Sequence, residues 1–502
     1  MIKKIEWRNL IFYGFIIVYS ISLVFLSFKL NIWEDEAYSL HTTSNKLSTV
    51  INQSYEFEGQ PPFYFLILAI WRHINSGIFF ARLFSLLFIG LSAYFFYRLV
   101  HLVSGFKGSR WTLVIFLLNP FTVWAALEIR LYALAIFLSI ILIYYFFLFY
   151  LEDKKKYLYI FLITSLIGLY TQYFFCLEIL ALGFSLLIFK GWKAFFRFCL
   201  YLLPIIVLFI PNLFFMHQQV SMLQSHRPEY SVLHRFSAVL HSPQELLLAL
   251  QVVPFKVTLN RLIRGVFIIV IIYAYYKAYK EQSLAGNFHF RNINIIILSI
   301  LVLVFLFCIL IGITGIIFQI KYFAIVFPLI ILVTTLFKVY PYFKSILIYA
   351  IISIYYISLN LFAYKTPVKN FDFKSAGKFV GKIERSREPI LLYDKSLLPP
   401  FTYYYTGSNL LIPLPAINYD HNFYEENIYD TLELKKAIEK INSPTNSYIL
   451  MTNKSDGYKY NLNMTEQMID KCLSANYNVI LDTSFLGENK NHTLRVRRLE
   501  VK

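Results

Sequence analysis

Long apolar runs alternate with short polar segments along the first 364 residues of the chain. A helix needs about 20 mostly apolar residues to cross a bilayer, so each long run is a predicted membrane span. The pattern predicts eleven spans, at residues 10–29, 78–99, 111–127, 131–151, 157–171, 173–190, 198–215, 264–279, 293–314, 321–338 and 344–363. The run "PPFYFLILAIW" at 61–71 is too short to cross alone and predicts a juxtamembrane or re-entrant helix.

The pattern changes after Tyr364, where polar and apolar residues become mixed. Apolar residues at helical spacing predict helices in "DFKSAGKFVGKIE" and "TLELKKAIEKIN". Four short segments predict strands, namely "EPILLYD", "NSYILMT", "NVILDTS" and "TLRVRRLEV". We therefore expect an all-α polytopic membrane domain at residues 1–364 and a small C-terminal α/β domain at residues 365–502.

Composition supports a membrane protein and excludes several other classes. Hydrophobic residues make up 58% of the chain and charged residues only 15%, more apolar surface than a water-soluble protein can bury. The net charge of +18 would suit nucleic acid, but the positive residues flank apolar runs and form no basic stripe. The 4 cysteines include no CxxC pair, which argues against a disulfide framework or a zinc site. No nucleotide-binding motif is present, so no ATP site is expected.

Lysine and arginine in the short loops predict the orientation, because cytoplasmic loops are enriched in them. With the N-terminus in the cytoplasm, every inner segment is basic. These residues are Lys3, Lys4, Arg8, Arg98, Lys107, Arg110, Lys154, Lys155, Lys156, Lys190, Lys193, Arg197, Lys277, Lys280, Arg291, Lys338 and Lys344. An odd number of spans sends the C-terminal domain outside. The first apolar run is long for a signal peptide and lacks a small-residue cleavage site, which predicts a retained span.

Several polar segments fall on the outer side in this topology. Asp35 and Glu36 lie in the first outer loop, and Glu128 follows the third predicted span. These carboxylates offer a general base and a partner acid. Arg130 and Lys321 offer cations suited to a phosphate, and function is the default interpretation of charges at membrane depth. With apolar walls around them, the group would suit a phosphate that carries a lipid tail and a transferable group.

Most of these residues also have an ordinary structural interpretation. Asp35 could be a solvated surface acid, and Glu128 with Arg130 could be an ion pair at a helix end. Lys321 could be a snorkelling lysine at the interface, and Gln172 a polar spacer. Some tyrosines could belong to an aromatic belt, and three cations are expected to face lipid headgroups. The tyrosines are Tyr132, Tyr173 and Tyr322, and the cations are Arg72, His73 and Arg82.

Six short motifs together resemble a known family. They are "DEAYS" (35–39), "QPPFYF" (60–65), "ARLFSLL" (81–87), "EIRLYAL" (128–134), "YTQYF" (170–174) and "KYFAIVFP" (321–328). In this order they resemble the polyprenyl-phosphate-dependent glycosyltransferases of the GT-C fold, close to bacterial relatives of protein O-mannosyltransferases and of the lipid A aminoarabinose transferase. The resemblance covers nearly the whole chain.

The resemblance implies a multi-pass enzyme of the bacterial inner membrane. It would move a hexose or pentose from a polyprenyl-monophosphate donor to a hydroxyl of a glycan, lipid or protein acceptor. Transfer would take place on the extracytoplasmic face, with inversion of the anomeric centre. No ATP is needed, because the activated donor supplies the energy.

The resemblance also implies roles for individual residues. Asp35 would be the catalytic base, and Glu36 and Glu128 would orient the base or the acceptor, or bind a divalent cation if the reaction uses one. The donor phosphate would be bound by Arg130, Lys321 and Tyr322. The expected substrate-binding residues are Gln60, Tyr64, Tyr132, Gln172 and Tyr173.

Three positions depart from the usual family pattern. Lys321 stands where relatives commonly carry arginine, which keeps the charge but loses the bidentate geometry. Gln60 and Gln172 stand where relatives often carry histidine. Glutamine can hydrogen-bond a sugar or a phosphate, but it cannot transfer a proton.

Two other classes of function remain open. A transporter or flippase of lipid-linked glycans would also place charges at membrane depth. It predicts related halves with paired broken helices, and the sequence displays neither. A non-catalytic subunit of an envelope assembly would keep the fold and tolerate the loss of Asp35.

Overall fold

The structure is a computed structural model. It describes residues 7–104, 106–152, 154–225, 232–249, part of 259–280, 288–313, 319–335, 342–416, 431–441, 446–454, 466–488 and 492–502. The chain forms two compact units. The helical unit comprises Met1–Phe25, Gln60–Trp71 and Phe79–Ala363, and the α/β unit comprises Leu26–Gly59, Arg72–Ile78 and Tyr364–Lys502.

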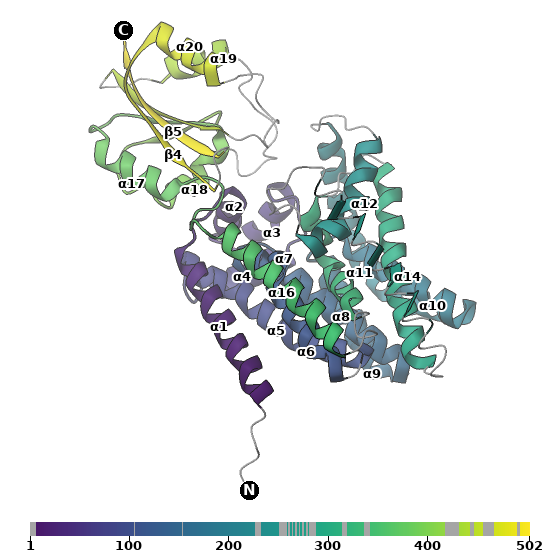
Figure 1. Cartoon of the computed structure of the whole chain (residues 1–502). Coiled ribbons are helices and arrows are strands. Elements are labelled where there is room, and N and C mark those ends of the chain that lie inside the picture. The colour runs from purple at the N-terminus through teal and green to yellow at the C-terminus, as the bar shows by residue number, and fades with distance from the viewer. Residues whose placement is uncertain are drawn as a thin grey trace. The chain divides into compact units, whose positions relative to one another are not determined.

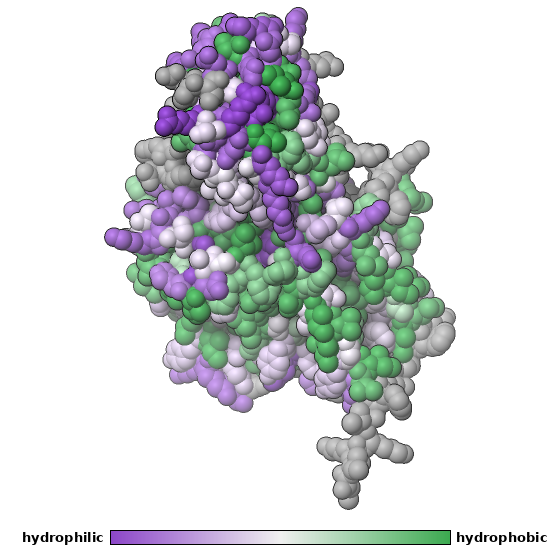
Figure 2. Space-filling view, turned by 90° about the vertical axis from the view of Figure 1, so that its left-hand side faces the viewer, coloured by the Kyte–Doolittle hydropathy of each residue, from purple (hydrophilic) through white to green (hydrophobic). Residues whose placement is uncertain are grey.

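The helical unit is built from apolar helices (Figure 1). They are α1 (Trp7–Lys29), α4 (Phe63–Arg72), α5 (Ile78–Ser104), α6 (Phe106–Leu118), α7 (Pro120–Leu127), α8 (Tyr132–Glu152), α9 (Lys155–Leu169), α10 (Phe175–Lys190), α11 (Trp192–Ser225), α12 (Val232–Leu248), α14 (Phe288–Ile313), α15 (Phe327–Leu332) and α16 (Tyr342–Ala363). Figure 2 shows apolar side chains gathered over the surface of this unit. Ile11 is 70% exposed and Leu361 71% exposed, as suits side chains that face lipid.

Five helices among the described residues are long and apolar enough to cross a membrane, namely Asn9–Lys29, Ile78–Val103, Tyr132–Tyr150, Trp192–Gln219 and Ser345–Ala363. They confirm that the predicted spans at 10–29, 78–99, 131–151, 198–215 and 344–363 are helices of spanning length. The predicted spans at 157–171, 173–190 and 293–314 are also helical, as α9, α10 and α14. The predicted span at 264–279 lies largely outside the described residues.

Two of the predicted spans are not single straight helices. The span at 111–127 bends by 57° between Ser109–Leu118 and Pro120–Leu127. Pro120 has no backbone N–H, and the Asn119 side chain accepts a hydrogen bond from the Phe121 N–H at 2.8 Å, which starts a new helix. The described part of 321–338 begins in a 3-10 helix, η1 (Ile320–Ile325), before α15. Hydropathy measures apolar content and does not detect these interruptions.

The C-terminal part of the α/β unit is a five-stranded sheet with the strand order β2-β1-β3-β5-β4. Strands β1 (Ile390–Tyr393), β2 (Leu411–Leu414) and β3 (Ser447–Lys454) are parallel, and β5 (Thr493–Val501) runs antiparallel to β3 and β4 (Tyr477–Leu486). Helices α17 (Phe373–Ile383) and α18 (Leu398–Thr402) pack on one face. Helices α19 (Thr431–Glu439) and α20 (Glu466–Asn476) pack on the other.

The four predicted strands and two predicted helices of this region are confirmed as β1, β3, β4, β5, α17 and α19. Strand β2, helix α18 and helix α20 were not predicted. Strand β2 has only four residues and contains Pro413, which fits an edge position because proline cannot donate a ladder hydrogen bond.

The first predicted outer loop is not irregular, because it forms helices α2 (Glu34–Thr42) and α3 (Leu47–Glu56). Glu34, Asp35 and Glu36 occupy the first turn of α2. Negative charge is favourable there, since unpaired N–H groups give the helix N-terminus a partial positive charge. Both helices belong to the α/β unit.

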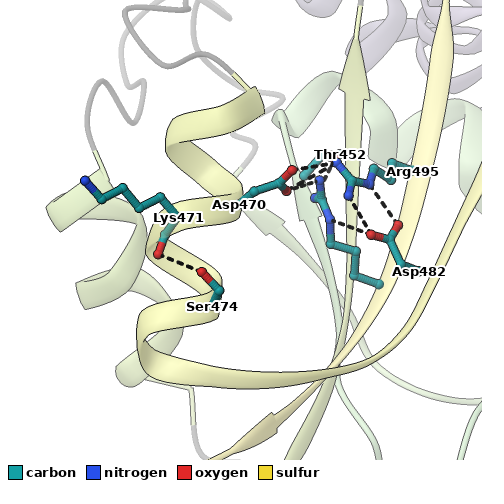
Figure 3. A network of polar contacts seen from close by, with 7 residues as sticks. Thr452, Asp470, Lys471, Ser474, Asp482 and Arg495 are labelled. Carbon is teal, nitrogen blue, oxygen red and sulfur yellow. Dashed lines mark hydrogen bonds and ion pairs between the residues drawn. The ribbon is translucent and has the colours of Figure 1, made fainter.

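An ion-pair network joins α20 to strands β4 and β5 (Figure 3). Arg497 is 1% exposed, and it donates to Asp470 at 2.7 Å and to the Thr452 hydroxyl at 3.1 Å. Arg495 donates to Asp470 at 2.9 Å and to Asp482 at 2.5 Å. Asp470 therefore neutralises a buried guanidinium and fixes α20 on the sheet.

Replacing Asp470 with alanine is expected to destabilise the α/β region by about 1–3 kcal/mol. Removing one partner of a buried ion pair costs about 3–5 kcal/mol, and this cost is reduced because the Asp470 side chain is 41% exposed. Hydrogen exchange of the β5 amides would measure the change. Lys471→Ala is the matched control, because Lys471 points away from the network (Figure 3). Equal exchange in both variants would contradict the assigned role.

Candidate functional site

The three acids of α2 differ in their environments. Glu34 is 5% exposed and Glu36 is fully buried, while Asp35 is half-buried. Asp35 is therefore the member of the triplet that solvent or a substrate can reach. Its exposure suits the predicted role of catalytic base better than the exposure of Glu34 or Glu36 does.

Glu36 forms an ion pair with Lys369, whose Nζ lies 3.0 Å from Glu36 Oε1. A carboxylate held in this way is already neutralised, so it suits an orienting role better than binding of a cation. Among the described residues, no group of three or more His, Cys, Asp or Glu side chains could hold a metal ion.

Glu34 faces away from solvent toward the loop that follows β1. Burial raises the pKa of its carboxyl well above the usual range, and the charges of Asp394 and Asp35 raise it further. A hydrogen bond with Ser396 opposes this shift. Burial and these charges therefore favour the neutral form of the Glu34 carboxyl, which limits the negative charge that it adds beside Asp35.

Glu128 and Arg130 lie in the connection between α7 and α8, on the helical unit. Glu128 is 1% exposed and Arg130 is 7% exposed. The Ser85 hydroxyl of α5 donates to the Glu128 carbonyl at 2.6 Å, which fixes this connection against α5. Both charged groups are therefore withdrawn from the surface, and buried ionisable groups in a membrane domain are candidate functional residues.

The segments that carry the other predicted residues of this unit meet one another. The Tyr322 ring on η1 lies 5.3 Å from the ring of Phe174, which places η1 beside the 170–174 turn. The Phe63 N–H donates to the Tyr170 carbonyl at 3.0 Å, which brings the 60–65 segment to the same turn. Lys321, next to Tyr322, is half-buried.

The 60–65 segment in turn contacts α5, which holds the connection that carries Glu128. The rings of Tyr64 and Phe84 are 6.0 Å apart, and Ser85 bonds the Glu128 carbonyl. Four segments that are distant in sequence are thus joined by contacts within one unit. They carry Glu128, Arg130, Lys321, Tyr322, Gln60, Tyr64, Gln172 and Tyr173. Asp35 and Glu36 belong to the α/β unit.

The predicted substrate-binding side chains differ in exposure. Tyr64 is 1% exposed and Tyr132 is 3% exposed, whereas Gln60 and Tyr173 are half-buried. Gln172 is 3% exposed, and its amide oxygen has no hydrogen-bond partner among the described residues. A buried acceptor without a donor is costly, so the hydroxyl of a bound ligand would stabilise it.

No protein-family model and no curated protein matches the sequence. Two solved structures match over nearly the whole chain. ArnT from Cupriavidus metallidurans in the apo state has a TM-score of 0.59 at 11% identity, covering 96% of this chain and 98% of that chain. The same protein bound to undecaprenyl phosphate has a TM-score of 0.56 at 12% identity with the same coverage. The chain has the GT-C fold of ArnT. The predicted fold class is therefore confirmed.

Two arginines of this ArnT-like fold, Arg72 at the end of α4 and Arg82 on α5, do not have the exposed positions that were predicted. Arg72 is 7% exposed and Arg82 is fully buried, so neither faces lipid headgroups as predicted. Arg72 donates to the Leu40 carbonyl at 2.6 Å and to the Thr43 hydroxyl at 2.5 Å, at the end of α2. An arginine is stabilised by carbonyl groups at a helix C-terminus, a partner that hydropathy does not reveal.

Glu178 is a further buried acid of this ArnT-like fold, and it was not predicted. It is fully buried on α10, and the Ser139 hydroxyl of α8 lies 2.8 Å from its Oε1. Ser139 also contacts the carbonyl of Ile325 on η1. A serine hydroxyl has one hydrogen, so both contacts are satisfied when the Glu178 carboxyl is protonated and donates to Ser139. An acid inside the apolar run at 173–190 was the signal that could have identified it.

Replacing Glu178 with alanine is expected to destabilise the helical unit by about 1–3 kcal/mol, because Ser139 loses a buried partner. Glutamine keeps a donor toward Ser139, so Glu178→Gln should remain close to the native protein in thermal unfolding. If the glutamine variant is destabilised as much as the alanine variant, the carboxyl is not acting as a neutral donor.

Proposed function

We propose that this protein is an integral membrane glycosyltransferase. It moves a sugar from a polyprenyl-monophosphate donor to an acceptor hydroxyl on the extracytoplasmic face. The observation that carries the proposal is the likeness to ArnT over 96% of this chain, together with the undecaprenyl phosphate bound in one of the ArnT structures. Buried or half-buried cations in the helical unit support a phosphate site there.

In this mechanism Arg130 and Lys321 bind the donor phosphate. Negative charge grows on the phosphate as the bond between it and the anomeric carbon breaks, and prepositioned cations stabilise that charge most in the transition state. The Tyr322 hydroxyl donates to the same phosphate. The bonding electrons leave with the phosphate oxygen, and polyprenyl monophosphate is released.

Asp35 acts as the general base. Its carboxylate takes the proton of the acceptor hydroxyl while the hydroxyl oxygen attacks the anomeric carbon. A single displacement of this kind inverts the anomeric centre. Glu36 orients Asp35 within α2, and Glu128 orients the acceptor. The donor supplies the free energy, so the reaction requires no nucleotide.

The remaining predicted residues bind the sugar. Gln172 accepts a hydrogen bond from a sugar hydroxyl through the amide oxygen that lacks a donor among the described residues. Gln60 lies at the start of the 60–65 segment, which contacts the 170–174 turn that carries Gln172. The aromatic rings of Tyr64, Tyr132 and Tyr173 provide apolar faces and hydroxyl groups, a combination suited to a sugar.

The membrane orientation is also part of the proposal. The basic inner loops favour a cytoplasmic N-terminus and an extracytoplasmic C-terminal domain in the bacterial inner membrane. A polyprenyl-linked donor suits such an enzyme, because its tail can remain in lipid while its phosphate and sugar enter the site. The acceptor can be a glycan, a lipid or a protein hydroxyl.

The rival class is a transporter or flippase, which predicts paired broken helices in related halves. The described residues contain one bent helix pair, Ser109–Leu118 with Pro120–Leu127. One bend next to Glu128 and Arg130 is consistent with an enzyme, since irregular backbone in membranes is tolerated where it lines a cavity.

The test is transfer from a panel of radiolabelled polyprenyl-phosphate hexoses and pentoses in membranes that contain the full-length protein. The proposal expects label to move from at least one donor to an acceptor, with release of polyprenyl monophosphate. Membranes without the protein are the control. Translocation of an intact donor without its cleavage would support the transporter. No transfer from any donor would argue against the enzyme.

A further inference from the structure

Helix α2 is held at its N-terminal end by the chain segment that enters the C-terminal sheet. Asn31 is 2% exposed, and its Oδ1 accepts from the Lys369 N–H at 2.5 Å. Its Nδ2 donates to the Phe371 carbonyl at 2.7 Å. One amide side chain thus pairs with the backbone on both sides of Asn370.

Asn370 makes this pairing possible through its backbone conformation. Its φ of 55° lies in the left-handed region, which asparagine tolerates better than most residues. Its carbonyl accepts from the Glu488 N–H at 2.9 Å, which fixes the turn to the end of β4. Tyr404 adds a contact from the turn after α18, because its hydroxyl accepts from the Ile32 N–H at 2.7 Å.

Lys369 also holds α2 through its side chain. Its Nζ lies 3.0 Å from Glu36 Oε1, and Glu36 is fully buried. The same residue therefore binds the entry to α2 through its backbone and the first turn of α2 through its ammonium group. At the other end of the helix, Arg72 bonds the Leu40 carbonyl. All of these residues lie within the α/β unit.

Asp35 stands between these fixed neighbours. Glu34 and Glu36 are its neighbours in the first turn of α2, and Lys369 neutralises Glu36. If Lys369 were neutral, the Glu36 carboxylate would lose the positive charge that lies 3.0 Å from it, one residue from Asp35. A like charge at that distance makes the ionised form of a carboxyl less favourable.

We propose that Lys369 is a positioning residue through which the C-terminal α/β domain orients helix α2 and keeps Asp35 ionised. The proposal gives this domain a role in catalysis without contact to the reacting atoms. It rests on the proposed function, because it takes Asp35 to be the base.

The test compares Lys369→Met with Lys369→Arg in the full-length protein. Lys369→Met is expected to lower kcat by about 100-fold, since small misplacement of a catalytic group has effects of that order. The KM for the donor should stay within about threefold, because the donor site is on other segments. The acidic limb of the pH profile should move up by about one pH unit. Lys369→Arg should restore kcat and the pH profile, because it keeps the charge.

Hydrogen exchange of the α2 amides is a second measurement that needs no activity. Lys369→Met should accelerate exchange in α2 and leave α17 unchanged. Lys374→Met is the matched control, because Lys374 is an exposed lysine on α17. If Lys369→Met does not fold, the double variant Glu36→Gln/Lys369→Met removes both charges. It should fold, keep fast α2 exchange and lose the pH shift.

Two results would overturn the proposal. One is unchanged α2 exchange in Lys369→Met, and the other is accelerated exchange with native kcat and a native pH profile. Failure of this proposal can be distinguished from failure of the proposed function. If the native protein transfers no sugar from any donor, the proposed function fails, while the exchange measurement still decides whether Lys369 holds α2.

Discussion

Replacing Asp35 with asparagine is expected to lower kcat for sugar transfer by about 10³-fold, within the usual range for loss of a general base. Asparagine keeps the size and the hydrogen-bonding shape of the side chain but cannot take a proton. Asp35 is half-buried between two buried acids, so the substitution should leave α2 folded. The KM for the donor should change by less than about threefold, because Asp35 acts on the acceptor.

The matched control is Glu56→Gln, which makes the same acid-to-amide change at an exposed position of α3. It should transfer sugar at the native rate. Initial rates over a range of donor and acceptor concentrations would separate kcat from KM. Equal transfer by the native protein and Asp35→Asn would exclude Asp35 as the base and favour a mechanism in which another group takes the proton.

Removing the charge of Arg130 is the second large effect that we expect. Arg130→Met should lower kcat/KM for the donor by about 10²-fold or more, since a prepositioned cation stabilises the leaving phosphate in the transition state. Arg130→Lys should recover part of the loss, because lysine keeps the charge without the bidentate geometry. The effect should be large because Arg130 is only 7% exposed, where water screens the interaction little.

Lys321 gives the complementary comparison. Lys321→Met should weaken donor binding, and Lys321→Arg should keep or improve it, because arginine can bind two phosphate oxygens. Binding of undecaprenyl phosphate to the purified protein would measure this without any transfer reaction. Lys155→Met is the control, because Lys155 is an exposed lysine of the same unit at the start of α9. A loss of binding in the control, or none in Lys321→Met, would contradict the assigned phosphate site.

Local patterns were sufficient for much of the fold. Apolar runs of spanning length identified helices such as α1, α5, α8 and α16, because a membrane helix satisfies its own backbone and depends little on distant residues. Apolar residues at helical spacing identified α17 and α19, which each bury one face, and short apolar segments identified β1, β3, β4 and β5. Strand β2 is as short as β1, but it is an edge strand whose residues are mostly half-buried, and Pro413 interrupts its apolar run.

The candidate site was predictable in its residue types but not in its arrangement. Charges and amides at membrane depth mark Glu128, Arg130 and Gln172, because burying such groups is costly unless they have a role. Their motifs cannot indicate which segments meet. That Tyr322 lies beside Phe174, and that Phe63 bonds Tyr170, follows from the packing of helices far apart in sequence.

The sequence by itself determined that the chain is a polytopic membrane protein with a polar C-terminal domain, and it singled out Asp35 among the acids of the first outer segment. Tertiary structure alone decided that this segment is helical and belongs to the same compact unit as the C-terminal sheet. The physical reason lies in the partners. Glu36 is neutralised by Lys369, 333 positions away, and Ser139 joins Glu178 to the Ile325 carbonyl across three elements. Such pairs stabilise a buried charge or polar group only once folding has brought them together, and no local pattern records them.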